Sequence, residues 1–143
     1  MAEVSFHLHV GDRLDYARRL LHKAVRQEKT VWVRGDAQTL DELDASLWSQ
    51  GAFLPHCRGG APYGVLARTP IVLDPAAPPW SEDVAAQAFL LNLGADVAQE
   101  FPRYARVIEI VGQDEEDKRQ ARRRWKHYAA AGVVPTTHQQ GDA

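Results

Sequence analysis

The side chains with the clearest chemistry lie together near the end of the chain, where residues 117–132 read DKRQARRRWKHYAAAG. Residues 118–128 contain no carboxylate and six cations, namely Lys118, Arg119, Arg122, Arg123, Arg124 and Lys126. The whole chain has a formal net charge of −2, so the remaining residues together carry −8. A cluster of cations this dense suits anions, either the phosphates of nucleic acid or the carboxylates of an acidic peptide.

Helical spacing sorts these residues into two stripes, because an α-helix turns once in about 3.6 residues. The basic stripe holds Lys118, Arg122, Trp125, Lys126 and Ala129, and the more apolar stripe beside it holds Ala121, Trp125, Tyr128 and Gly132. Trp125 therefore lies where the apolar and the basic faces meet. A charge run is most often only a solvated face, but an aromatic edge beside cations also fits nucleic acid or an acidic peptide with an apolar end.

Two observations favour the peptide over nucleic acid. The charge of −8 on the rest of the chain repels an extended phosphate backbone. The segment also offers one tryptophan and one tyrosine, whereas a single strand needs a series of aromatic side chains for its successive bases. We therefore expect no direct contact with nucleic acid, and keep a nucleic-acid-binding protein that uses the basic helix as the alternative.

Other candidate sites have a simpler structural explanation. The glycine-rich segment RGGAPYG, residues 58–64, does not lie between a strand and a helix and matches no nucleotide-binding pattern. His7 and His9 could share a metal ion on one face of a strand, or could line its polar side. His56 and Cys57 are adjacent, which suits loop packing better than catalysis. The acidic run, residues 114–117, is explained by a position at the first turn of a helix, where the helix dipole favours negative charge. We expect no enzyme, cofactor or metal.

The elements that position the basic helix alternate along the chain. Residues 4–10, 30–34, 70–74, 88–94 and 105–112 are predicted as strands, and residues 12–29, 36–51 and 114–132 as helices. Residues 53–64 and 75–83 contain too many turn formers for an element. This alternation predicts a three-layer α/β domain with a mainly parallel sheet.

Length and composition fit one ordinary globular domain. The chain has 143 residues, of which we expect residues 1–132 to form the domain and residues 133–143 to be a frayed tail. Its single cysteine, Cys57, excludes an internal disulfide. We see no signal peptide, and no run approaches the ~20 apolar residues that span a membrane. The expectation is a cytoplasmic protein without a membrane partner.

Three segments in this order resemble one known family. They are LDELDASLW followed by FLPH in residues 40–56, RGGAP in residues 58–62, and the basic segment 117–132. Over nearly its full length the chain is similar to the chi subunit of bacterial DNA polymerase III, an accessory protein of the clamp loader. The sequence departs from the family in two places: Trp125 replaces a residue that is often tyrosine, and the loop 57–70 aligns only with gaps.

The resemblance implies a Rossmann-like domain that has no nucleotide site and no enzymatic activity. It implies binding to the acidic, phenylalanine-ended C-terminal tail of single-stranded-DNA-binding protein. The matching positions for that tail are Lys118, Arg122, Trp125 and Lys126, with Val111 beneath them. It also implies a partner, psi, which tethers chi to the clamp loader and faces Trp48, Phe53 and Pro55.

Trp48 and Phe53 can each be interpreted as a core residue or as part of the surface that binds psi. The apolar pattern alone places Trp48 and Phe53 in the core. The resemblance reverses this for Phe53, and leaves Trp48 open between core and interface. We expect a monomer when the protein is alone and a heterodimer with its partner. A third hypothesis, a small enzyme, predicts a convergent polar pocket at the carboxyl ends of the strands.

Overall fold

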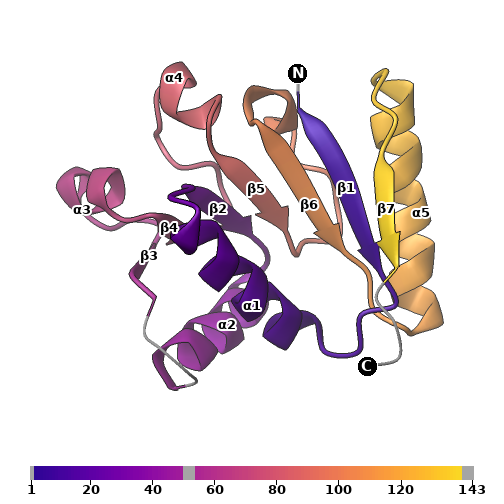
Figure 1. Ribbon diagram of the computed structural model, residues 1–143, viewed down its shortest axis with the longest axis horizontal. Helices are drawn as coiled ribbons and strands as arrows, with labels where there is room; N and C mark the ends of the chain where they lie inside the picture. The colour runs from indigo at the N-terminus through magenta and orange to yellow at the C-terminus, as the bar shows by residue number, and fades with distance from the viewer. Residues whose placement is uncertain (1, 50–53, 140–143) are drawn as a thin grey trace.

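A single parallel sheet organises the protein in the computed structural model, which describes residues 2–49 and 54–139. Within these residues all pairs are parallel, and the strand order is β3-β4-β2-β5-β6-β1-β7 (Figure 1). The strands are β1 (Glu3–Leu8), β2 (Val31–Arg34), β3 (His56–Arg58), β4 (Ile71–Leu73), β5 (Phe89–Asn92), β6 (Arg106–Ile110) and β7 (Thr136–Gln139).

Helices lie on both faces of this sheet, as the alternating pattern predicts. They are α1 (Arg13–Arg26), α2 (Ala37–Ser49), α3 (Tyr63–Arg68), α4 (Glu82–Ala85) and α5 (Glu115–Ala130), with a 3-10 turn at Phe101–Arg103. α1 and α2 pack on one face and α5 on the other, which makes the Rossmann-like three-layer arrangement (Figure 1). No helix of the described part of the chain is long and apolar enough to cross a membrane.

Local sequence signals set the ends of the two helices that matter most for the site. Asp12 caps α1 by accepting a hydrogen bond from the Asp15 amide, and Asp114 caps α5 in the same way through the Asp117 amide. The C-terminal end of α5 is followed by Gly132, whose φ of +86° favours glycine. Both N-caps leave a negative charge at the positive end of a helix dipole.

The core forms two layers, one on each side of the sheet. Along the strands, side chains alternate between them: Trp32, Leu90 and Val107 belong to the layer on the α5 side, whereas Val33, Leu91 and Ile110 belong to the layer on the side of α1 and α2. Because the central strands are buried on both faces, their sequences read as continuous apolar runs. The prediction that residues 88–94 form such a strand is confirmed by β5, although the strand is shorter.

Two segments predicted as irregular contain regular structure. β3 and α3 lie within or next to residues 53–64, and α4 begins at the end of the proline-rich loop. β3 exists because it pairs with β4 at the edge of the sheet, with His56 opposite Ile71. That pairing is tertiary, so the local content of glycine and proline does not reveal it.

The predicted frayed tail is also partly wrong. Thr136–Gln139 forms β7, which pairs in parallel with β1 from Ser5 to Leu8. Buried Val133, 7% exposed, anchors the chain just before this strand. The four residues of β7 are polar and exposed, so no apolar alternation in the sequence predicts a strand there. β7 forms because its backbone pairs with the otherwise open edge of β1. Residues 140–143 lie outside the described residues.

Removal of β7 should therefore weaken the fold. A chain that ends at Pro135 loses the ladder on β1, which we expect to lower the free energy of unfolding by about 1–3 kcal/mol. Hydrogen exchange should become faster at β1 amides, and a chain that ends at Gln139 provides the matched control. Equal melting temperatures for the two truncated chains would contradict the role given to β7.

Candidate functional site

A groove runs along α5 where the carboxyl ends of β1 and β6 meet the first half of the helix. We call it the α5 groove, and its volume is about 410 Å³. Its lining residues are Phe6, Leu8, His9, Val111, Gly112, Lys118, Ala121, Arg122, Trp125 and Lys126. The structure thus brings together all five residues that the sequence assigns to one site, since Lys118, Arg122, Trp125, Lys126 and Val111 are among them.

The floor of the α5 groove is apolar. Val111 and Ala121 expose only 2% and 6% of their surface, and Phe6 lies deeper still. The ring of Trp125 packs on that of Phe6, with 5.1 Å between centroids and 49° between planes. Trp125 is half-buried, as its place between the two helical stripes predicts. The floor can therefore accept one apolar side chain from a ligand.

The rim of the groove carries three cations, of which one already has a carboxylate neighbour within the protein. Lys118 lies 3.6 Å from the carboxylate of Glu115, which is itself 84% exposed. Within residues 2–49 and 54–139, no carboxylate lies within 4 Å of Arg122 or Lys126. These two cations therefore keep their charge available for an anionic ligand.

The loop between β6 and α5 holds one wall of the groove in place. The Gly112 amide donates a hydrogen bond of 2.5 Å to the Asp117 carboxylate, which also lies 3.7 Å from the Arg13 guanidinium. A Cβ at Gly112 would come within 2.9 Å of that carboxylate, so a larger residue there would have to displace the Asp117 side chain from this hydrogen bond. Gln113 donates to the carbonyl of His9. These contacts preorganise the groove and therefore reduce the entropy that binding costs.

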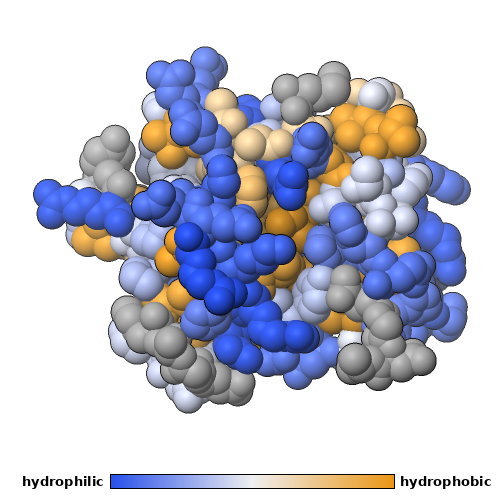
Figure 2. Space-filling view, viewed as in Figure 1, coloured by the Kyte–Doolittle hydropathy of each residue, from blue (hydrophilic) through white to orange (hydrophobic). Residues whose placement is uncertain are grey.

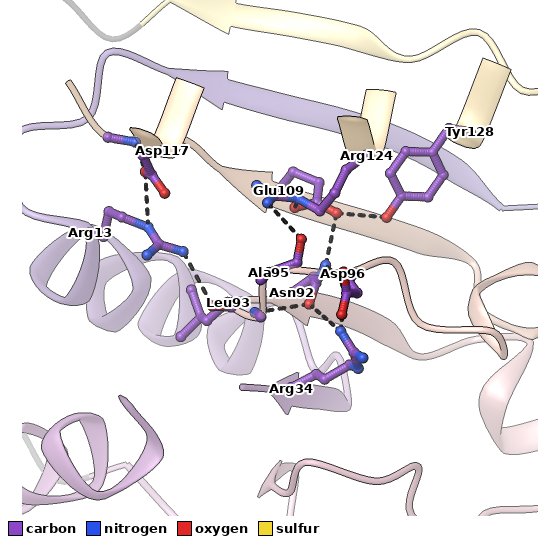
Figure 3. Close-up of polar contacts among 12 residues, drawn as sticks. Arg13, Arg34, Asn92, Leu93, Ala95, Asp96, Glu109, Asp117, Arg124 and Tyr128 are labelled. Carbon is purple, nitrogen blue, oxygen red and sulfur yellow. Dashed lines mark hydrogen bonds and ion pairs between the residues drawn. The ribbon is translucent and has the colours of Figure 1, made fainter. Parts of the chain in front are cut away.

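A buried network docks α5 on the sheet (Figure 3). The Glu109 carboxylate in β6 is fully buried and accepts hydrogen bonds from three groups. They are Arg124 Nε at 2.9 Å, the Tyr128 hydroxyl at 2.6 Å and Asn92 Nδ2 at 3.0 Å. Arg124, which the sequence groups with the surface cations, is only 3% exposed. Its charge is therefore held inside the protein and is not offered to a ligand.

Further contacts extend this network to the ends of three neighbouring strands. Asn92 Oδ1 accepts from Arg34 Nη1 at 3.1 Å, and Arg124 Nη1 donates to the Ala95 carbonyl at 3.2 Å. Burial raises the pKa of Glu109, even though Arg124 and the other donors oppose this effect. Burial, followed by the Glu109 charge, raises the pKa of Tyr128, so the phenol stays protonated as a donor.

These convergent polar groups occupy the place where the enzyme hypothesis requires a pocket. The side chains of Asn92, Glu109, Arg124 and Tyr128 lie at the carboxyl ends of β5 and β6, but they are buried and bonded to one another. The sequence pattern did not predict that these four side chains converge. The available signal was Glu109 within the apolar strand, together with Arg124 and Tyr128 one helical turn apart.

The second predicted surface is described in part. Trp48 is 65% exposed, so the interpretation of this residue as core is wrong. Its ring lies 5.3 Å from that of His56, which bonds to the Asp44 carboxylate and to the Leu54 carbonyl. Pro55 is exposed nearby in sequence, and Phe53 lies outside the described residues. The face of α2 used for the core is that of Leu40, Leu43 and Leu47.

The two histidines His7 and His9 do not share a face, because only His7 lies in β1. His7 is half-buried beside Tyr16 and His138 on the α1 side of the sheet, whereas His9 follows the strand, has a φ of +59° and lines the α5 groove. Among residues 2–49 and 54–139, no group of three or more His, Cys, Asp or Glu side chains could hold a metal ion. Cys57 is partly buried in β3, and burial raises the pKa of its thiol.

Comparison with known proteins finds one family over nearly the whole chain. Residues 1–136 match the model of the family described as DNA polymerase III chi subunit, HolC. The chain is also similar to the DNA polymerase III subunit chi of Pseudomonas aeruginosa. The two sequences are 31% identical over 129 residues, which cover 88% of this chain and 85% of that protein.

The buried network should appear as strong coupling between two residues. Arg124→Met leaves Glu109 without its cation, which we expect to cost about 3–5 kcal/mol of unfolding free energy. Glu109→Leu combined with Arg124→Met removes the stranded charge and should recover much of that loss. Denaturant unfolding of the single and double variants measures the coupling.

Arg123→Met is the matched control, because Arg123 is exposed on the same helix. It should change the unfolding free energy by no more than about 0.5 kcal/mol. If Arg124→Met and Arg123→Met have the same stability, or if the two substitutions at positions 109 and 124 are simply additive, the network does not hold α5.

Proposed function

The chain belongs to the DNA polymerase III chi subunit family, and from this premise we propose that its α5 groove binds the acidic C-terminal tail of single-stranded-DNA-binding protein. A chi subunit is an accessory subunit of the replicase, and we infer that this one acts by binding and not by catalysis. The observation that carries the proposal is an apolar floor beside Arg122 and Lys126, two cations without a carboxylate partner in the described part of the chain.

The groove offers each part of such a tail a complementary group. The tail ends in phenylalanine, whose ring would pack against Trp125 and above Val111 and Ala121. Its terminal carboxylate and the acidic residues before it would meet Arg122, Lys126 and Lys118. Arginine suits a bidentate contact with a carboxylate, whereas lysine makes a point contact. An acidic peptide without an apolar end would satisfy only half of the site.

Magnitudes indicate which contacts dominate binding. An exposed ion pair contributes at most about 1 kcal/mol, so no single cation should control affinity. A well-buried apolar anchor contributes more, about 1.5–3 kcal/mol. We therefore expect micromolar affinity, near −8 kcal/mol, that weakens with salt but does not vanish.

A second partner completes the linking role. We propose that a psi-like subunit of the clamp loader binds Trp48 and Pro55, together with Phe53, and forms a heterodimer with a chain that is otherwise monomeric. Trp48 lies near the C-terminal end of α2, whereas α5 lies towards the opposite edge of the sheet (Figure 1). This separation supports simultaneous binding of both partners, which is what a link between single-stranded-DNA-binding protein and the clamp loader requires.

Charge reversal tests the groove. Arg122→Glu should weaken a peptide with the acidic, phenylalanine-ended sequence by about tenfold, because one attraction becomes a repulsion. Arg123→Glu makes the same change in net charge at an exposed position that does not line the groove, and should have a much smaller effect. Titration calorimetry measures both, and thermal unfolding checks that the variants remain folded.

The same variants separate the peptide from the alternative ligand. A protein that binds nucleic acid through its basic helix should bind a bare oligonucleotide with a steep salt dependence. Both charge reversals should then weaken that binding alike. Such a result, or equal effects of the two variants on the peptide, would show that α5 is only a diffuse cationic face.

The exposed tryptophan gives a prediction for the second surface. Trp48→Ala should leave the melting temperature almost unchanged and abolish binding of the clamp-loader partner. Truncation of a buried tryptophan to alanine would instead lower the free energy of unfolding by about 3–5 kcal/mol. Thermal unfolding and sedimentation of the mixture give the two readouts. A stable variant that still forms the heterodimer would remove Trp48 from the proposed interface.

A further inference from the structure

One face of the sheet is hollowed beside α1. A recess of about 860 Å³ lies over β6, β1 and β7 and reaches the side of α1. We call it the sheet-face groove, and its lining residues include Ser5, His7, Tyr16, Leu20, Ile108 and Thr136. Figure 2 shows apolar surface at the bottom of a recess in the middle of this view, surrounded by hydrophilic side chains. It lies on the face opposite α5 (Figure 1).

A helix would complete the layer at this position. Strands of a parallel sheet are normally covered on both faces. Here α5 covers the far side of β1, where Phe6 is 1% exposed, whereas His7 and Ile108 on the near side remain partly exposed. α1 supplies one wall of the groove through Leu20, and β7 supplies the other. The exposed Val134, 87% accessible, adds apolar surface beside β7.

The rim of the groove is mainly basic. Lys23 and Arg106 line it, and Lys29 lies 5.7 Å from the centroid of the Phe89 ring, which also lines it. The one carboxylate among the lining residues is Glu3, which pairs with Arg106 at 3.1 Å. Burial, followed by the charges of His138, Lys23 and Arg106, lowers the pKa of His7 to about 4. The groove is therefore electropositive as well as apolar.

Position in the fold argues against a nucleotide as the occupant. Ligands of open α/β sheets bind at the carboxyl ends of the strands. The sheet-face groove instead reaches the amino ends of β1, β5 and β6, where Glu3, Phe89 and Arg106 are the first residues. A small phosphorylated ligand would thus lie at the end of the sheet that this fold does not use for such ligands.

The rings of the groove are already engaged, which argues against single-stranded nucleic acid. Phe89 has the Arg106 guanidinium 5.4 Å from its centroid in addition to Lys29. His138 lies over His7 with 4.8 Å between centroids and 32° between planes, and the Tyr16 hydroxyl is hydrogen-bonded to His7. Successive bases need free ring faces for stacking.

We propose that the sheet-face groove docks an amphipathic helix of a partner protein, with an apolar stripe on Leu20 and Ile108 and acidic side chains towards Lys23 and Arg106. The occupant is a helix because the empty space lies where the missing layer of the sandwich would be. It is acidic because the lining cations outnumber the single lining carboxylate. This site is distinct from the α5 groove and from the Trp48 surface, so it does not depend on the function proposed for either.

A designed peptide tests this proposal on the full chain. The probe is an end-capped helix of about 16 residues made of leucine, alanine and glutamate, with leucines on one stripe. One control has the same composition in scrambled order, and the other replaces each glutamate by lysine. In amide NMR spectra we expect the acidic helix, and neither control, to shift Ser5, His7, Ile108 and Thr136.

Matched variants assign the binding to the groove. Lys23→Glu should weaken the acidic helix about three- to tenfold. Arg26→Glu changes the charge of the same helix at an exposed residue outside the groove, and should change the affinity by less than about twofold. Arg122→Glu disables the α5 groove and should leave this binding intact, so the outcome is independent of the function proposed above.

Three results would overturn the proposal. The acidic helix could leave the groove resonances unchanged, or its binding could depend on Arg122 and not on Lys23. An oligothymidylate probe could shift the same groove resonances with a dependence on Lys23, which would make the occupant single-stranded nucleic acid.

Discussion

The buried carboxylate of Glu109 determines how the last helix lies on the sheet. An unpaired carboxylate inside a protein is strongly unfavourable, so the fold needs the donors that surround it. Two of these donors, Arg124 and Tyr128, belong to α5 and lie one turn apart. They therefore fix both the position of the helix and its rotation about its own axis.

That rotation creates the α5 groove. Residues two positions before and after Arg124 are turned by about 200° from it, so Arg122 and Lys126 point away from Glu109. Trp125 lies between these directions and closes on Phe6. The six cations of the segment consequently have different roles. Arg124 is internal, and Lys118 and Arg119 have acidic neighbours on the helix. Arg123 is exposed outside the groove, so Arg122 and Lys126 are the two groove cations without a carboxylate partner in the described residues.

The sequence predicts those features that depend on local pattern. Helical spacing placed Trp125 at the boundary of core and solvent, and the apolar runs located the central strands. The helical pattern placed Arg122 on the basic stripe, but it did not distinguish the buried Arg124 from the adjacent, exposed Arg123, because only the position of Glu109 decides which arginine points inwards. β3 and β7 were missed for a related reason, since each edge strand depends on a neighbour distant in sequence. The sheet-face groove results from which strands the helices leave uncovered, so no residue pattern marks it.

We propose that α5 presents a receptor for the end of a peptide and not for negative charge alone. Titration calorimetry with two otherwise identical acidic, phenylalanine-ended peptides tests this most directly, one with a free terminal carboxylate and one amidated. We predict that amidation weakens binding by about tenfold, or about 1.4 kcal/mol, because the terminal carboxylate loses its charge-assisted contact. Equal affinity of the two peptides would contradict the account, since binding would then need only a general attraction between opposite charges.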